Sequence, residues 1–543
     1  MTSPQPSPPL PEESAADRFL ELSLLANFVT HGLAMVLMAL VLAPMLPGGG
    51  EPDPVARVAR IAAHPWQFRL GWLPWHLCAV TDLWLAVALL RVRWIPKVPA
   101  VLVLVLTVAA VVPDQYAQIA WVTRGVDLAQ AATNARDLGA YLDFEGGIFV
   151  MTASWAAFLY TLAAIGWTAC FAMARTWSRA LTGVSVVAWA VMLFVTGAFF
   201  LPAAGRPSPE VIAIGNALGF TLLQVWFALV TEEVLRRRRP LAAVGRDAPW
   251  RHPWQNAVGR ALDLVANSRF AGAFLEPLPA FAMVSDITDV VYVNYLVRAE
   301  RLAPLVPPGL EIQRLGPRKE YALFTFLTYR HGHFGFRLLG PLRRLMPSPV
   351  QTNWRIHVKD PRTGARGIFF VTNAITATPQ ALGARMLTEG MPMHVLEAGS
   401  VTRAEDGTMT VSLNPGAGSA PDCKATFSPA RTPELEAPWS ACFGSFRDFL
   451  ASCVPQDRAM STQPSAGTVT RQEIDLGIPL DICEPLAGEV QSRAAAAIVG
   501  DTKPLCFRVA KVFFRFEVEE KDPLPAGSTA PAERPAPPSA AAA

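Results

Sequence analysis

Six long apolar runs dominate the first 240 residues of this 543-residue chain. They cover 19–46, 70–90, 98–122, 147–174, 180–201 and 211–235. Each run has the ~20 mostly apolar residues that a helix needs to cross the hydrocarbon of a bilayer. A helix is stable there because it satisfies its own backbone hydrogen bonds without water. The runs predict an all-α transmembrane bundle of about six helices. The protein is therefore expected to be a multi-pass protein of the cell membrane and to have the lipid bilayer as a partner.

Tryptophan and lysine divide the chain into the same two parts. Thirteen of the fifteen Trp lie at or before Trp254, and six of the seven Lys lie after it. Trp favours the membrane interface and charged side chains are costly in hydrocarbon, so a membrane part precedes an aqueous part. The net charge of +3 is too small to indicate a nucleic-acid partner. The seven Cys lack metal-binding spacing and are interpreted as reduced, mostly buried residues.

The basic residues between the runs predict the orientation of the bundle. The loops after the second, fourth and sixth runs carry Arg91, Arg93, Lys97, Arg175, Arg179 and the four arginines 236–239. The connection between the third and fourth runs, on the other side, is acidic. The first-to-second loop, with Arg57 and Arg60, departs from this pattern. Because short basic loops stay in the cytoplasm, both termini are expected to be cytoplasmic.

Four ionisable residues fall within or at the edge of the apolar runs: His31, His76, Asp82 and Asp114. An ionisable side chain at membrane depth is costly, so each is a candidate functional position. They fit the substrate or ion path of a transporter. The simpler alternative is that they hydrogen-bond between helices and hold the bundle together. Two histidines at unlike depths are a poor case for haem, so no cofactor is expected.

From about residue 284 the apolar pattern changes from long runs to alternation. The segments 290–297, 321–329, 353–359, 367–374, 408–413 and 508–519 are predicted to be strands. In 353–359, Trp354 and its alternate neighbours face one way, while Asn353, Arg355 and His357 face the other. Short helices are expected near 298–305, 379–387 and 444–452. The second half is therefore predicted to be a mainly β domain.

These patterns predict five parts along the chain. They are a disordered N-terminus (1–18), a transmembrane domain (19–235), a basic juxtamembrane linker (236–275), a β domain (276–521) and a disordered tail (522–543). The linker contains Trp250 and Trp254 among arginines. That composition is typical of a segment lying on the anionic surface of the cytoplasmic leaflet.

Three segments of the second half resemble the acetoacetate-decarboxylase-like superfamily. They are VVYVNYLVRAERLAPLVPPGLEI (290–312), TNWRIHVKD (352–360) with GIFFVTNAITATPQALGARMLTEGMPMHVLEAG (367–399), and KPLCFRVAKVFFRFEV (503–518). The resemblance covers roughly 284–520 and is closest to the YqjF-like branch of the superfamily. It implies a cone-like, closed antiparallel barrel with a polar interior pocket.

The same resemblance allows the decarboxylase chemistry to be checked. In that family two adjacent lysines follow a proline, and one of them forms a Schiff base with a β-keto acid after its pKa is depressed. Here Arg385 and Pro392 match the family, but Met393 and His394 stand at the lysine positions. Because methionine cannot form an imine, Schiff-base decarboxylation is not expected.

The resemblance gathers Arg355, His357, Arg385, Glu389 and His394 around the implied pocket. An arginine pair suits a carboxylate or another planar anion, and His394 is the candidate general base. The simpler alternative is that Arg355 pairs with a carboxylate in the domain and that His394 is a satisfied core residue. His331 and His333 are interpreted as part of a turn, and no metal site is expected.

Three functions remain open at this point. One is a membrane-anchored module that binds a small organic anion in its cytoplasmic β domain. A second is an enzyme that acts on a keto acid or related compound without a Schiff base, through Arg355, Arg385 and His394. A third is a transporter with a cytoplasmic ligand-binding domain, for which Asp82 and Asp114 are the evidence. The oligomeric state is not predicted.

Overall fold

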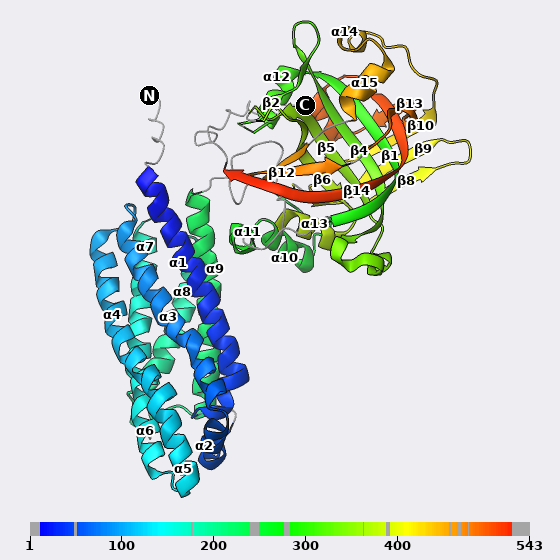
Figure 1. Ribbon diagram of the computed structural model, residues 1–543. Helices are drawn as coiled ribbons and strands as arrows, with labels where there is room; N and C mark the ends of the chain where they lie inside the picture. Colours follow the sequence, from blue (N-terminus) through cyan, green and yellow to red (C-terminus); the bar gives the residue numbers. More distant parts are fainter. Residues whose placement is uncertain are drawn as a thin grey trace, which may run out of the picture. The chain divides into compact units, whose positions relative to one another are not determined.

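The computed structural model describes residues 11–47, 51–174, 177–202, 205–238, 249–275, 283–307, 309–361, 363–386, 391, 393–454, 458–463, 468–475 and 477–523. The chain divides into two compact units, Met1–Arg238 and Arg239–Ala543. The first is helical and the second is mainly β, as Figure 1 shows.

The helical unit is a bundle of long helices (Figure 1). Its helices are α1 (Pro11–Leu37), α2 (Pro54–Ala63), α3 (Pro65–Arg91), α4 (Lys97–Ala120), α5 (Val126–Ala135), α6 (Gly139–Val150), α7 (Ala157–Met173), α8 (Arg179–Ala198) and α9 (Pro209–Arg238). Six helical stretches are long and apolar enough to cross a membrane: Ala15–Met45, Pro65–Arg91, Lys97–Ala135, Gly139–Met173, Arg179–Ala198 and Pro209–Arg236. The predicted number of spans is confirmed, and the protein is a multi-pass membrane protein.

Three of these stretches are continued by π-helical turns. They are η1 (Met38–Leu42) after α1, η3 (Trp121–Gly125) between α4 and α5, and η4 (Met151–Ala156) between α6 and α7. A short 3₁₀ turn, η2 (Ala43–Met45), ends the first stretch. Because of η3 and α5, the third helix extends to Ala135, well beyond the predicted limit of its apolar run.

The outer surface of the bundle is apolar, as hydrocarbon requires. Leu40, Val98 and Val112 are 75%, 74% and 64% exposed. Among the buried charged residues of the unit is Arg57 of α2, whose Nη2 lies 2.6 Å from Glu145 Oε2 of α6. Both side chains are more than nine-tenths buried. This ion pair holds the short helix α2 against the bundle, because breaking it would leave a buried charge without its counter-charge, which is energetically costly.

The β unit is built on one 14-stranded sheet. Its main strands, in sheet order, are β1 (Met283–Arg298), β4 (Tyr321–Phe336), β5 (Val350–Lys359), β6 (Arg366–Ile375), β11 (Arg458–Gln463), β12 (Thr468–Asp475), β14 (Leu505–Pro523), β13 (Glu484–Gln491), β10 (Cys423–Pro429), β9 (Met409–Asn414) and β8 (Ala398–Arg403). Three short strands lie off this path: β2 (Glu311–Ile312), β3 (Arg314–Leu315) and β7 (Met393–Val395).

The predicted closed barrel is not supported for this sheet. Strand β1 pairs with β14 as well as with β4, but the strands from β13 to β8 continue past that point and end at β8. The pairing is also not purely antiparallel, because β6 pairs in parallel with β11 and with β7. The mainly β character itself is as expected, and the six predicted strands correspond to β1, β4, β5, β6, β9 and β14.

Short helices flank the sheet at both ends (Figure 1). They are α10 (Ala257–Ala266), α11 (Arg269–Leu275), α12 (Ala299–Leu302), α13 (Thr378–Met386), α14 (Trp439–Cys442), α15 (Phe446–Cys453) and α16 (Arg493–Val499), with the 3₁₀ turns η6 (Ala303–Leu305), η7 (Arg337–Leu345) and η8 (Leu480–Ile482). Helices α10 and α11 contact α13. They belong to the predicted linker, yet Trp250 is fully buried with Ile368 and Phe370 of β6. This part of the segment therefore packs on the β unit.

The alternation predicted in 353–359 is present in β5. Trp354, Ile356 and Val358 lie in the largest apolar cluster of the unit, and the Trp354 ring stacks on Phe326 at 4.6 Å between ring centroids. The opposite face of β5 carries Asn353 and Arg355. The sheet therefore places an apolar core on one face and polar side chains on the other.

Candidate functional sites

The helical unit surrounds a cavity of about 1040 Å³, here named the bundle cavity. It is large for a ligand site, since such pockets range from about 300 to 1,000 Å³. Its walls carry five Trp side chains, and their polar or ionisable residues include His31, Cys78, Asp82, Asp114, Gln118, Tyr160 and Arg206. The cavity extends to residues 46–47 and 206–209, in the loops at one end of the bundle. Three of the four predicted intramembrane residues therefore share one cavity.

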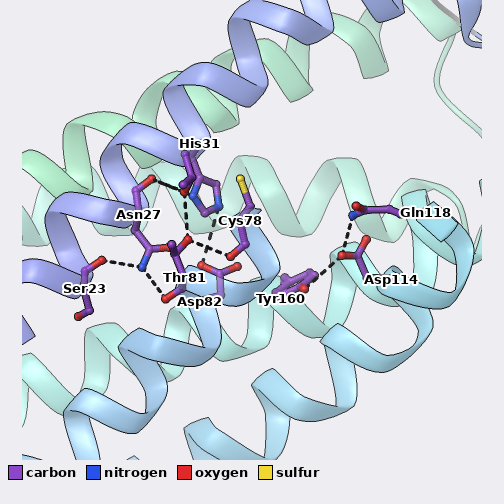
Figure 2. A network of polar contacts seen from close by, with 10 residues as sticks. Ser23, Asn27, His31, Cys78, Thr81, Asp82, Asp114, Gln118 and Tyr160 are labelled. Atoms are coloured by element: carbon purple, nitrogen blue, oxygen red, sulfur yellow. Dashed lines mark hydrogen bonds and ion pairs between the residues drawn. The ribbon is translucent and has the colours of Figure 1, made fainter. Parts of the chain in front are cut away.

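His31 and Asp82 meet on one wall of the bundle cavity (Figure 2). The Nδ1 atom of His31 lies 3.0 Å from the carbonyl oxygen of Asn27 and donates to it, because a carbonyl only accepts. The Nε2 atom is then left facing Asp82 Oδ1, at 3.9 Å. Among the described residues, that Oδ1 atom has no hydrogen-bond partner.

Asp114 lies beyond Tyr160 in the same view (Figure 2). Its Oδ2 atom accepts from Gln118 Nε2 at 2.8 Å, from Gln115 Nε2 at 3.2 Å and from the Tyr160 hydroxyl at 3.3 Å. These donors are neutral. They hold the carboxyl group in place but supply no positive charge.

His76 does not join this group. Its Nδ1 atom lies 2.8 Å from Gln115 Oε1, and it is not among the residues that line the bundle cavity. The structure thus places His31 beside Asp82 and connects Asp114 to Tyr160 by a hydrogen bond. His76 instead connects α3 to α4 through its contact with Gln115. For His76, the alternative that it holds the bundle together fits the observed contact.

The β unit has a much smaller hollow, of about 30 Å³, here named the sheet cavity. It is lined by Ile287, Tyr292, Leu327, Tyr329, Asn353, Arg355, Ile368, Phe370, Ile478 and Val512. These side chains come mainly from β1, β4, β5, β6 and β14. Space of this size holds about two water molecules. The hollow can take a carboxylate-sized group but not a larger molecule unless side chains move.

Arg355 is the charged residue of the sheet cavity. It is 4% exposed, and its Cζ atom lies 5.5 Å from the centre of the Tyr292 ring. No carboxylate of a described residue lies within 4.0 Å of it, and its Nε atom has no hydrogen-bond partner among those residues. Burial raises the pKa of the Tyr292 hydroxyl to about 12, and the neighbouring Arg355 charge limits that rise. A buried cation without a counter-charge is costly, so this arginine is the least satisfied charge of the site.

A chain of hydrogen bonds ends at the same cavity. His331 Nε2 lies 2.7 Å from Gln351 Oε1, Gln351 Nε2 donates to Asn353 Oδ1 at 2.7 Å, and Asn353 Nδ2 donates to the Tyr329 oxygen at 3.0 Å. Since Gln351 Oε1 only accepts, His331 Nε2 carries the proton. Each residue of the chain donates to the next, and the Tyr329 oxygen is the last acceptor. The hydroxyl proton of Tyr329 therefore remains free for another acceptor. The cavity therefore offers this hydroxyl and Arg355 Nε as donors.

His331 is the first residue of this hydrogen-bond chain. The predicted turn at His331 and His333 is wrong. Residues 330–333 are part of β4, which continues to Phe336, and His331 is 1% exposed. Its Nδ1 atom lies 2.8 Å from the Ser285 hydroxyl. Burial lowers the pKa of His331 to about 4, so the ring is neutral near pH 7. No group of three metal-ligating side chains occurs in the described part of the chain.

His357 lies beside Arg355 but has separate contacts. Its Nε2 atom is 3.4 Å from the Thr325 hydroxyl, which donates to Asn294 Oδ1 at 2.9 Å. Burial, followed by the charges of Arg355 and Arg366, lowers the pKa of His357 well below its usual value. His357 is therefore a neutral neighbour of the arginine.

The other predicted site residues lie elsewhere. Arg385 donates from Nε to the Ala266 carbonyl at 3.1 Å, and His394 Nδ1 lies 2.7 Å from the Ser419 hydroxyl. Burial, with a smaller effect of Arg385, lowers the pKa of His394 to about 3. No hydrogen bond or ion pair between described residues joins His394 to Arg355. Glu389 lies outside the described residues.

Met393, at the predicted lysine position, is buried in the apolar cluster of Ile368 and Phe370. Those two residues also line the sheet cavity. His394, the next residue of β7, is not in that cluster. The position that would matter for a Schiff base is thus occupied by an apolar side chain near the cavity wall.

Comparison with known families supports the resemblance. Residues 285–453 match a family of uncharacterized conserved proteins, DUF2071. The match falls within the β unit and confirms, for that part of the chain, the resemblance to the YqjF-like branch. No curated protein matches the chain.

Solved structures of acetoacetate-decarboxylase-like proteins are also similar to the second half. An acetoacetate decarboxylase from Legionella pneumophila is 13% identical, covering 45% of this chain and 92% of that one, with a TM-score of 0.31. An acetoacetate decarboxylase-like enzyme from Sphingomonas wittichii is 10% identical, covering 46% and 95%, with a TM-score of 0.35. The enduracididine biosynthesis enzyme MppR is 15% identical, covering 46% and 91%, with a TM-score of 0.30. At these scores the likenesses carry no argument about activity or ligand.

Proposed function

We propose that this multi-pass membrane protein, whose residues 285–453 match the DUF2071 family, is a membrane-anchored binding protein for a small organic anion. The β unit captures the anion at Arg355, and the orientation predicted from the basic loops puts this unit in the cytoplasm. The observation that carries the proposal is the buried Arg355 guanidinium, which has no carboxylate partner among the described residues.

A carboxylate fits this environment in charge and in hydrogen bonding. It would accept from Arg355 Nε and from the Tyr329 hydroxyl, the two donors that the sheet cavity leaves free. Such charge-assisted bonds would also remove the cost of the unpaired cation. The cavity of about 30 Å³ favours the smallest members of the class. We therefore expect affinity to fall from formate to acetate to butyrate.

The contacts of the other candidates favour binding over catalysis. His394 is bonded to Ser419, and Met393 cannot form an imine. Lys511 of β14, a lysine that could otherwise supply a Schiff-base amine, is exposed. The proposal therefore includes neither a Schiff base nor a general base.

The test is a calorimetric titration of the purified full chain with formate, acetate and butyrate. Arg355→Met should weaken formate binding at least about tenfold, which corresponds to about 1.4 kcal/mol. Arg403→Met, which removes an exposed arginine of β8, is the matched control and should bind as the parent does. If the parent binds none of the three anions, or Arg355→Met binds them equally well, the proposal is wrong.

A further inference from the structure

The bundle cavity is more than thirty times larger than the sheet cavity. It is lined by two carboxyl groups, whereas the charged residue of the sheet cavity is an arginine. Its ionisable side chains away from the loops include two carboxyl groups, Asp82 and Asp114. The one basic side chain within 4.0 Å of either, among the described residues, is His31 beside Asp82. Arg206 lines the cavity as well, but it donates to the carbonyls of Phe199 and Leu201 near the loop end.

We infer that the bundle cavity is a binding site for a lipophilic organic cation, whose positive charge lies between Asp82 and Asp114. An ionised carboxylate in hydrocarbon needs a counter-charge, because its desolvation costs several kcal/mol. Asp82 Oδ1 lacks a hydrogen-bond partner among the described residues, and its side chain is 6% exposed. Asp114 has neutral donors alone. A bound cation would supply the charge that the described part of the bundle does not.

The aromatic walls suit the same class of ligand. Trp72, Trp75, Trp121, Trp167 and Trp189 all line the cavity. An indole ring attracts a cation over its face, by about 2 kcal/mol or more where water is excluded. The same rings provide apolar area for the hydrocarbon part of an amphipathic molecule. A simple metal ion would use neither property, so the cavity fits an amine or quaternary ammonium with apolar substituents.

The geometry also favours one entrance for the ligand. The cavity reaches residues 206–209, where α9 begins, and α9 ends at Arg238, which leads to the β unit. A helix of 30 residues is about 45 Å long. The cation would therefore enter at the end of the bundle opposite to the one where the chain leaves for the β unit.

The test uses two probes of nearly the same shape and opposite charge, tetraphenylphosphonium and tetraphenylborate. The purified full chain, in nanodiscs of zwitterionic lipid, is titrated with each while tryptophan fluorescence is recorded, and empty nanodiscs give the partition background. We expect saturable quenching by tetraphenylphosphonium and no saturable quenching by tetraphenylborate. Asp82→Asn and Asp114→Asn should each weaken tetraphenylphosphonium binding at least about tenfold, because amides of equal size lack the charge.

Two further variants keep the test decisive. Asp127→Asn removes an exposed carboxylate of α5 outside the cavity and should leave binding unchanged. Ala213→Phe narrows the cavity near the start of α9 while leaving both acids in place, so it should weaken binding even if the aspartate variants fold poorly. Equal binding of the two probes, or unchanged tetraphenylphosphonium binding in both aspartate variants and in Ala213→Phe, would overturn the inference and leave an apolar hollow filled by lipid.

Discussion

The two units of this protein enclose hollows that differ in size and in the ionisable side chains that line them. The sheet cavity is about 30 Å³ and contains Arg355. The bundle cavity is about 1040 Å³ and contains Asp82 and Asp114. Each unit also has a buried ion pair in which both charges have a counter-charge, here called a complete pair: Arg471–Asp360 in the sheet and Arg57–Glu145 in the bundle. The contrast separates buried charges that are paired within the fold from the groups for which we propose a ligand.

The largest expected effect comes from breaking a complete pair. Asp360→Asn removes the charge that lies 2.8 Å from Arg471 Nε, where the Asp360 side chain has no exposed surface. Leaving one buried charge alone costs about 3–5 kcal/mol. We expect the free energy of unfolding of the β unit to fall by that amount, measured by pulse proteolysis of the full chain in urea. Asp501→Asn, at an exposed position, should have no measurable effect.

The second effect comes from acid, because buried neutral histidines make the β unit sensitive to pH. His331 has a usual pKa of 6.5 and a folded value of about 4, as its burial disfavours the charged form. Between these values the unfolded chain binds a proton that the folded chain does not. Stability therefore falls as the pH drops through this window, by about 1.4 kcal/mol per pH unit for this histidine.

His331→Gln should reduce this slope while keeping polar contacts at the site. The measurement compares urea midpoints of the full chain at pH 6.5 and pH 4.5 by pulse proteolysis. His333→Asn is the control, because His333 is exposed and asparagine tolerates its backbone φ of 54°. A parent slope unchanged in His331→Gln would contradict the assignment of this histidine as buried and neutral.

The third prediction separates Arg355 from a structural arginine. Arg355→Met removes a buried cation that has no counter-charge among the described residues, so we expect the stability of the β unit to stay the same or to rise by up to about 2 kcal/mol. Arg471→Met, in the complete pair, should lower it by about 3–5 kcal/mol. Pulse proteolysis in urea measures both. A loss in Arg355→Met as large as in Arg471→Met would mean that Arg355 stabilises the fold.

The smallest effect is expected in the bundle. Asp82→Asn keeps the side-chain volume and removes a carboxyl group whose Oδ1 has no described hydrogen-bond partner. We expect the melting temperature of the full chain, followed by the loss of the monodisperse peak in size-exclusion chromatography, to rise by about 1–3 °C. Glu145→Gln, in the complete pair with Arg57, should lower it. A clear decrease in Asp82→Asn would remove the distinction between the two kinds of charge.

The sequence predicts the two units well because their signals are local. Length and apolarity identify each membrane helix without knowledge of its neighbours. Alternation in 353–359 separates Trp354 from Arg355, and the structure places them on opposite faces. The order of strands depends on pairing between distant segments, which is why the open end at β8 was not predicted.

The candidate sites were predicted less completely, for the same reason. Arg355 could be selected from its strand, but Tyr292 and Tyr329 reach it through the pairing of β1 and β4 and of β4 and β5. Gly332 lies between His331 and His333, for which the sequence predicts a turn. In the structure it marks a close approach of β1, because a Cβ atom there would lie 2.6 Å from the Asp286 carbonyl oxygen. A glycine within a strand pattern could have indicated this close approach of two backbones.

The π-helical turns of the bundle have one more consequence. A π turn holds one residue more than an α turn, so it adds a residue without changing the phase of the helix on either side. All three such segments contribute to the bundle cavity, through Met38 and Ala39, Trp121, and Thr152 and Ala153. At η3 and η4, which lie between α-helices, one residue could therefore be lost while the helix keeps its packing elsewhere. Single-residue deletions at these turns would then change which side chains line the cavity. In an uninterrupted α-helix, the same deletion would rotate every residue on one side of it out of its packing position.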